Sequence, residues 1–322
     1  MGVFVYLPLV LPLTALPMAR LAEQHLHPRS ATRLLAVTGS TLALCSTLCL
    51  ALLMVVGTAQ LPGNPLPDGW SDPEVRAAVP YEEKAGLIAI GVLGAVLAVC
   101  GSTLLRHTRA RIRAAHALGP EAGNGAAGDL TVIPSPDPFA YALPGGRGRG
   151  RGDVGQVVVS TAMMECLDPR ERRALVAHER AHLTGRHHRY LLATQLAARA
   201  NPFLLPLRTA VAYSTERWAD EEAAYTVGSR RTVATAVGKA ALFANREPGP
   251  AVLPGFAAAA GPVPRRVAAL LDPEPSAGLW PPASAHLAVA AVTATVGTAA
   301  SALSSLNATV TLVGILHAAT PL

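Results

Sequence analysis

Long apolar runs and short polar loops alternate over the first third of the chain, and another apolar run lies near its end. Four runs have the ~17–25 mostly apolar residues that cross the ~30 Å hydrocarbon core of a bilayer. They cover residues 3–19, 34–59 and 85–105, and about 283 to 319. The pattern therefore predicts about four transmembrane helices. The last run is long for one crossing, so a tilt, an interfacial tail or a hairpin stays open, with one span as the default.

The first run contains Pro8, Pro12 and Pro17, and no Lys or Arg precedes it. A secretory signal peptide has basic residues before an uninterrupted apolar region. This run has neither feature, and its prolines are expected to kink the helix. We expect a proline-kinked span, with a cleaved signal as the alternative.

Composition agrees with a membrane protein, because 51% of the 322 residues are hydrophobic and only 15% are charged. The net charge of +6 raises the possibility of a nucleic-acid partner. However, the arginines flank apolar runs instead of forming one amphipathic face, so no nucleic acid is expected. The four cysteines lack the spacing of a disulfide framework or a metal motif and are interpreted as apolar packing residues.

Basic residues between the apolar runs predict the orientation. Arg20, Arg29 and Arg33 follow the first run, and a second arginine cluster spans residues 106–113. The loop between the second and third runs is acidic, and short loops rich in Lys and Arg stay in the cytoplasm. We therefore expect a multi-pass plasma-membrane protein with its N-terminus outside. Its predicted parts are a three-span membrane region (1–105), a cytoplasmic domain (106–280), and a C-terminal membrane span and tail (281–322).

The polar segment predicts three short strands followed by a well-marked helix. The strands are Leu130–Ile133, Ala140–Leu143 and Gln156–Ser160, after an Ala/Gly-rich linker over residues 114–128. An Arg-Gly run at residues 145–152 separates the last two strands; it can bind RNA, but a loop near anionic headgroups is favoured. Asp168, Pro169 and Glu171 form a capping-box pattern at the start of the helix, which we expect to end near Gly185.

This helix carries the sequence His178-Glu179-Arg180-Ala181-His182. Residues four apart share a helix face, so the two imidazoles can bind one Zn²⁺. Glu179 follows the first of them and is predicted to be the general base for a metal-activated water.

A catalytic zinc takes three protein ligands and keeps one position open, so a third ligand must come from elsewhere in the fold. The best candidate is Glu216. On a helix, Asp220 lies about 40° around from Glu216, where it can hydrogen-bond a ligand histidine and fix its tautomer.

Together these motifs resemble the membrane gluzincin zinc metallopeptidases. The resemblance covers about residues 130–270 and rests on the strand ending at Ser160, the Asp168-Pro169 pair, the histidine motif and Glu216-x-x-Ala219-Asp220. Within the gluzincins, the chain looks most like the regulatory peptidases related to β-lactam sensor-transducers, and next most like HtpX-like and CAAX-prenyl-protease-like enzymes. The resemblance implies one zinc per chain, cytoplasmic peptide-bond hydrolysis, His178, His182 and Glu216 as ligands, and Glu179 as base.

HtpX-like enzymes place two membrane spans between the second histidine and the third ligand. Here residues 183–215 are too few for two spans, which need ~40 residues and a turn. We expect a helix pair that packs on the domain or dips into the membrane interface.

Several further residues have weaker signals. We expect a His, Tyr or Arg side chain near the metal to stabilise the oxyanion. The sequence alone does not choose among the candidates Tyr190, Tyr213, Tyr225 and Arg231. His187 and His188 either support the site or are surface residues, and His286 and His317 are interpreted as weakly polar packing. Arg265-Arg266 is expected to anchor the last helix near the membrane.

The fold class that follows is a mainly α membrane protein with a cytoplasmic α+β zincin-like (gluzincin) domain. The expected function is zinc-dependent endopeptidase activity on a protein or peptide substrate, with the lipid bilayer as the other partner. By analogy, the substrate is a transcriptional repressor or a membrane regulator. The alternatives are a membrane quality-control protease, a non-catalytic signalling protein with a structural zinc, and RNA binding through the Arg-Gly run.

Overall fold

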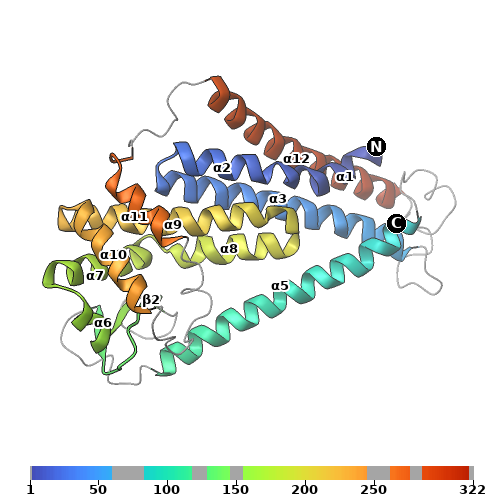
Figure 1. Cartoon of the computed structure of the whole chain (residues 1–322). Coiled ribbons are helices and arrows are strands. Elements are labelled where there is room, and N and C mark those ends of the chain that lie inside the picture. Colours follow the sequence, from blue (N-terminus) through green and yellow to red (C-terminus); the bar gives the residue numbers. More distant parts are fainter. Residues whose placement is uncertain are drawn as a thin grey trace.

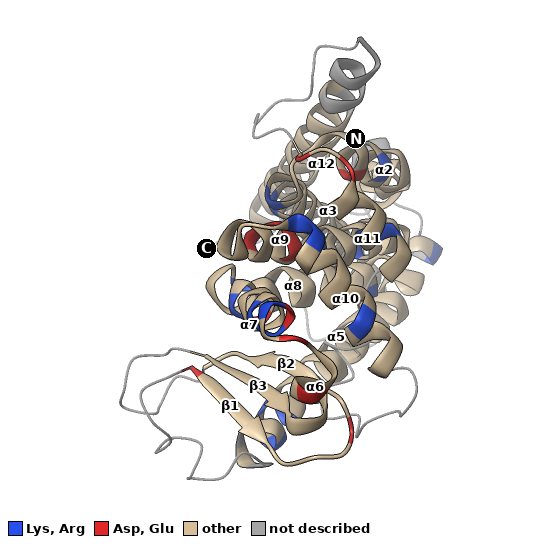
Figure 2. Cartoon of the chain, turned by 60° about the vertical axis from the view of Figure 1, so that its left-hand side comes forward, with Lys and Arg blue, Asp and Glu red and all other residues tan. Residues whose placement is uncertain are grey.

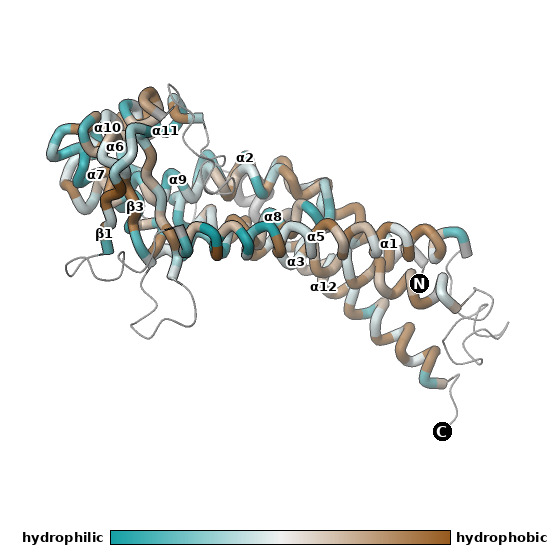
Figure 3. The backbone as a smooth tube through the Cα atoms, turned by 90° about the horizontal axis from the view of Figure 1, so that it is seen from below, coloured by the Kyte–Doolittle hydropathy of each residue, from teal (hydrophilic) through white to brown (hydrophobic). Residues whose placement is uncertain are grey.

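The structure is a computed structural model, and the fold is mainly helical with one small sheet (Figure 1). The residues that it describes are 2–59, 83–117, 129–145, 155–244, 262–275 and 285–318. Figure 1 shows long helices running side by side, with the sheet and shorter helices gathered at one end. The tube in Figure 3 is brown along much of the long helices and teal around α7, α10 and β1, so the apolar and polar parts lie at different ends.

Four helical segments are long and apolar enough to cross a membrane, in agreement with the predicted number of spans. They are Val5–His25, Pro28–Val55, Lys84–Ala114 and Ala294–Ala318. The helices that contain them are α1 (Gly2–Val10) with η1 (Leu11–Thr14) and α2 (Ala15–His25), then α3 (Pro28–Thr58), α5 (Glu83–Ala117) and α12 (Ala285–Ala318).

The shapes of two of these segments agree with the sequence analysis. The first segment breaks at η1, which contains Pro12, because proline cannot donate the hydrogen bond that a continuous α-helix requires. The last apolar run is one unbroken helix, α12, over its described residues, as one crossing requires.

Helices α3 and α5 approach closely where two glycines meet. A Cβ atom on Gly57 would lie 2.3 Å from the backbone carbon of Gly86, and one on Gly86 would lie 2.5 Å from the Cα atom of Gly57. Small residues allow this close backbone contact, which is common between membrane helices.

The segment between the second histidine and Glu216 is a helix pair, as expected, but it packs against the apolar helices α2 and α3 and not only on the polar domain. It consists of α8 (His187–Ala200), η4 (Pro202–Leu204) and α9 (Leu205–Val227). The pair packs against α2 and α3, with Leu204, Leu207 and Val211 in one buried cluster with Leu35 and Leu42.

The turn of this helix pair reaches the middle of α3. The side-chain amide of Asn201 donates to the hydroxyl of Ser46 at 3.1 Å, and that hydroxyl donates to the carbonyl of Pro8 at 2.7 Å. The polar turn is therefore satisfied among the apolar helices, where an unpaired amide would be costly.

The three strands β1 (Leu130–Ile133), β2 (Ala140–Leu143) and β3 (Gln156–Ser160) have the predicted bounds. Their order is β1-β3-β2, with β1 parallel and β2 antiparallel to β3. Val157 and Val159 are fully buried under α6 (Thr161–Cys166), and β2 is the edge strand beside α7.

Helix α7 (Pro169–Thr184) begins with the predicted capping box and ends before Gly185. The carboxylate of Asp168 accepts from the amides of Arg170 and Glu171 at 2.8 and 2.9 Å, and Glu171 accepts from the amide of Asp168 at 2.8 Å. Two further helices, α10 (Arg230–Ala244) and α11 (Val263–Leu271), pack beside α7 and α9 in one apolar cluster. Figure 2 shows charged residues on α7, α9 and α11 at this end of the molecule.

Three predicted segments lie outside the described residues: the acidic loop over 60–82, most of the linker over 118–128, and the Arg-Gly run over 146–152. The division at residues 105 and 280 and the cytoplasmic location also remain predictions.

Candidate metal centre

Helices α7 and α9 lie against each other and bring three predicted ligands together. His178 and His182 lie one turn apart on α7, with their Nε2 atoms 3.1 Å apart. The carboxylate of Glu216 on α9 lies 3.5 Å from each of these nitrogens, through Oε2 to His178 and Oε1 to His182. In the described part of the chain, this is the one group of three His, Cys, Asp or Glu side chains whose ligand atoms converge, within 4.8 Å.

These residues fit a single Zn²⁺ ion. Two imidazole nitrogens and one carboxylate oxygen are ligands that zinc prefers, and three protein ligands leave a position for water or substrate. Nδ1 of His178 lies 3.0 Å from Oδ1 of Asp220, a contact that favours the proton on Nδ1. The lone pair of Nε2 then faces His182 and Glu216, as metal binding requires.

Arg266 of α11 joins the two acidic residues of α9. Its Nε and Nη2 atoms donate to both carboxylate oxygens of Asp220 at 2.8 and 2.6 Å, and its Nη1 atom lies 2.9 Å from Oε2 of Glu216. Asp220 is fully buried and Arg266 is 5% exposed. Burial by itself raises the pKa of Glu216, but Arg266 and the two histidines outweigh it and hold that pKa below its ordinary range.

The expectation that Arg265-Arg266 anchors a helix at the membrane is wrong for Arg266. Arg266 and Leu270 are four residues apart on α11, and both turn toward the protein interior. Only Arg265 is partly exposed, and it pairs with Glu23 of α2 at 2.7 Å. The sequence contains a signal that could have shown this, because Arg266 shares a helix face with Leu270. An arginine on the apolar face of a helix is expected to be buried and therefore to pair with an acidic residue.

His187 supports the second histidine. It is 1% exposed, its Nδ1 atom lies 2.9 Å from Nδ1 of His182, and its ring lies 4.5 Å from that of Trp218. Burial, followed by the charge of His182, lowers the pKa of His187, so the imidazole is neutral. A continued helix would turn His187 about 140° away from His182, but Arg186 has a positive φ of 51° and redirects the chain.

Glu179 is on α7, and its side chain reaches the backbone of the edge strand β2. Burial raises the pKa of Glu179 to about 7, and the charge of Glu216 also raises it. His178, Arg266 and a hydrogen bond with the backbone of Ala142 in β2 act in the opposite direction. A carboxyl group with a pKa near neutrality can both accept and return a proton.

A comparison with protein families bears on this geometry. Residues 106–205 match the family model of Peptidase family M48. This part of the chain is therefore similar to the peptidases of family M48. No curated protein and no solved structure matched the chain.

The M48 match includes the sheet, α7 and α8, and it ends at Leu205, the first residue of α9. It therefore contains His178, Glu179 and His182, whereas Glu216 comes from the fold outside the matched residues. M48 peptidases are metal-dependent, so the family supports a metallopeptidase activity. The match confirms the resemblance to membrane zinc metallopeptidases, without deciding between the regulatory and the HtpX-like groups.

The tyrosines considered as oxyanion stabilisers differ in their surroundings. Tyr225 is 87% exposed, and Tyr213 lies under the guanidinium of Arg265, 4.0 Å from its ring centroid. Tyr190 packs near Trp218 at 6.3 Å. Among the hydrogen bonds, ion pairs and ring contacts of the described residues, none joins these tyrosines to the three candidate ligands.

Proposed function

We propose that this chain is an integral-membrane zinc endopeptidase that cleaves a protein substrate on the cytoplasmic side of the plasma membrane. The convergence of His178, His182 and Glu216, with Glu179 on the same helix, carries the proposal. The M48 match supports its metallopeptidase part. Zinc, when bound, supplies a Lewis acid that polarises a peptide carbonyl and acidifies water.

Each residue around the metal has a separate task. His178, His182 and Glu216 hold the ion, while Asp220 orients His178 and His187 orients His182. Arg266 keeps Glu216 ionised. Glu179 accepts the proton of the attacking water and then donates it to the leaving amine, a role that suits its raised pKa.

The edge strand β2 suggests how a substrate is held. Within the described sheet it pairs only with β3, so its other edge is available to an extended peptide. Ala142 of this strand contacts Glu179 through its backbone. A peptide added beside β2 would therefore run past the general base.

The arginines support the proposed orientation. Arg111 near the end of α5 donates to the carbonyl of Gly145 at 3.0 Å, so this basic end lies beside the sheet. The first turns of α3, which contain Arg29 and Arg33, lie at the same end of the molecule as the sheet (Figure 1). Basic residues that flank spans stay in the cytoplasm, so the metal centre is assigned to that side.

The alternatives differ in substrate and in catalysis. A repressor or membrane regulator as substrate rests on the family resemblance alone, as does quality control of membrane proteins. In a non-catalytic signalling protein the zinc would be structural. The half-buried Glu179 beside the metal ligands favours the enzyme, because a structural site needs no base.

The test uses the full chain, purified in detergent with Zn²⁺, and reduced casein as an unfolded substrate. We expect wild-type protein to hydrolyse casein, and the Glu179→Gln variant to lose at least about a hundredfold in rate while it keeps one zinc per chain. Equal rates in the two proteins would refute the role of Glu179. One bound zinc without hydrolysis by the wild type would favour the structural-zinc alternative.

A further inference from the structure

A basic cavity lies next to the metal centre. Its volume is about 490 Å³, and it is lined by the start of α3, the turn between α7 and α8, and α9. Four arginines line it, Arg29, Arg33, Arg186 and Arg189, against one acidic residue, Glu222. The lining therefore carries a formal charge of +3, from four positive charges and one negative charge.

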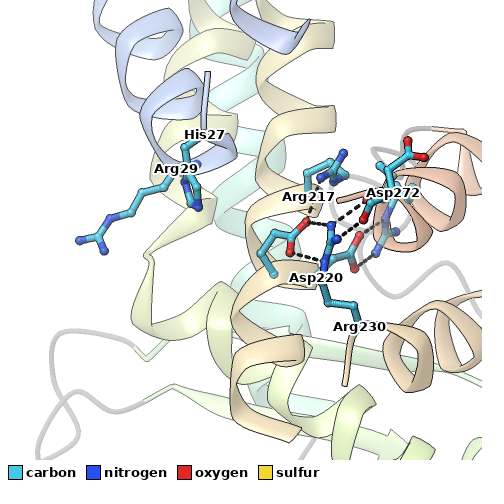
Figure 4. Close-up of polar contacts among 9 residues, drawn as sticks. His27, Arg29, Arg217, Asp220, Arg230 and Asp272 are labelled. Carbon is cyan, nitrogen blue, oxygen red and sulfur yellow. Dashed lines mark hydrogen bonds and ion pairs between the residues drawn. The ribbon is translucent and has the colours of Figure 1, made fainter. Parts of the chain in front are cut away.

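These four arginines have no Asp or Glu partner among the described ion pairs. The neighbouring Arg217 and Arg230, by contrast, both lie 2.9 Å from Glu221. Figure 4 shows Arg29 pointing away from the polar cluster of Arg217, Asp220, Arg230 and Asp272. Unneutralised guanidinium groups that converge on one cavity favour an anionic ligand.

Trp218 forms the apolar wall of the cavity. It is 6% exposed, and the guanidinium carbons of Arg29 and Arg33 lie 5.5 and 5.4 Å from its ring centroid. These distances are within the range of cation–π contact, which holds the two side chains over the ring. The cavity thus has a fixed apolar side and several guanidinium groups, which can hydrogen-bond phosphate oxygens in pairs.

The position of the cavity points to the source of the anion. Arg29 and Arg33 lie in the first two turns of the candidate span Pro28–Val55. Leu34 and Val37 lie within the next turn of this helix and are 54% and 63% exposed, as expected for side chains that contact lipid tails. The arginines therefore lie where the apolar segment ends, at the depth of lipid headgroups.

We propose that this cavity binds the phosphate of an anionic membrane lipid. Bound there, the headgroup contacts Arg29, Arg33, Arg186 and Arg189 while its tails continue along the exposed face of α3. Trp218 packs on His187, which in turn contacts His182. The lipid is thus linked to a candidate metal ligand through two side chains, although its binding does not depend on the proposed peptidase activity.

The test measures lipid binding to the full chain in a neutral detergent by native mass spectrometry. The probes are dioctanoyl phosphatidylglycerol, the zwitterionic dioctanoyl phosphatidylcholine, inorganic phosphate and a Glu-rich peptide. We expect saturable binding of one phosphatidylglycerol per chain, tighter than that of the other three probes. A double substitution Arg29→Gln and Arg33→Gln should weaken it at least about tenfold, since each basic residue near the headgroup contributes on the order of 1 kcal/mol.

The matched control is Arg109→Gln with Arg113→Gln, which removes the same charge from two exposed arginines at the basic end of α5. This variant should bind the lipid as the wild type does, and Arg189→Gln on α8 should weaken binding as a second variant of the cavity. An equal loss in the α5 control would overturn the proposal, because binding would then follow net charge. Tighter binding of free phosphate would identify a soluble anion as the ligand, and tighter binding of the acidic peptide would identify a peptide site; either result also overturns it.

Discussion

Replacing Arg266 by leucine would leave the buried carboxylate of Asp220 and the mostly buried carboxylate of Glu216 without their cation. In the wild type, Arg266 makes two hydrogen bonds to Asp220, at 2.8 and 2.6 Å, and one contact with Glu216 at 2.9 Å. Removing one partner of a buried ion pair typically costs about 3 to 5 kcal/mol, because the remaining charge stays desolvated. At roughly 2 °C per kcal/mol for a large domain, the midpoint of thermal unfolding should fall by roughly 6 to 10 °C.

The assay is thermal unfolding of the metal-free chain in detergent, with Arg265→Leu as the matched control. Arg265 is the preceding residue on α11, and its partly exposed ion pair with Glu23 and its contact with the Tyr213 ring should together contribute only about 1 to 2 kcal/mol. Arg266→Lys should recover part of the lost stability, because lysine keeps the positive charge but cannot form the bidentate hydrogen bonds that a guanidinium makes to a carboxylate. If Arg266→Leu unfolds at the wild-type midpoint, Arg266 does not neutralise this site and the reasoning is wrong.

Two further predictions concern the surroundings of the site. Gly185→Ala should lower the free energy of unfolding by about 1 to 3 kcal/mol, because the new Cβ atom would lie 2.2 Å from Nε2 of His187. The control is Gly238→Ala in α10, which should not lower it, because a Cβ atom there meets nothing within 4 Å. Equal midpoints of thermal unfolding for the two variants would contradict this account. Asp129→Asn removes the ion pair with Arg180, whose hydrogen bond is the main cause that lowers the pKa of Asp129. The ion pair contributes fully to stability above the pKa of Asp129 in the unfolded chain, about 4, and this contribution is lost as the pH falls through the lower pKa of the folded state. In chemical denaturation, the wild type should therefore be more stable than the variant at pH 7, and the two should be equally stable at pH 2. A stability difference that does not change with pH would argue against the ion pair.

Local patterns in the sequence were sufficient for most of the elements. The four apolar segments, the three strands and the capped helix α7 appear as predicted, because each depends on hydrophobic length, alternation or a cap within a few residues. The spacing of His178 and His182 also follows from the helix alone, since four residues make about one turn.

Only the tertiary structure decided what surrounds these residues. Arg266 comes from a separate helix 46 residues after Asp220, and no local spacing relates the two. His187 returns to His182 through a backbone turn at Arg186, and Arg29 of α3 meets Trp218 of α9 because the α8–α9 pair folds back into the apolar bundle. The sequence by itself determined the helices, the strands and the metal-binding motif, whereas packing between distant helices determined the charges, the protonation and the cavity around them. The physical reason is that helix and strand signals act over a few residues, while burial and ion pairing depend on which distant segments meet.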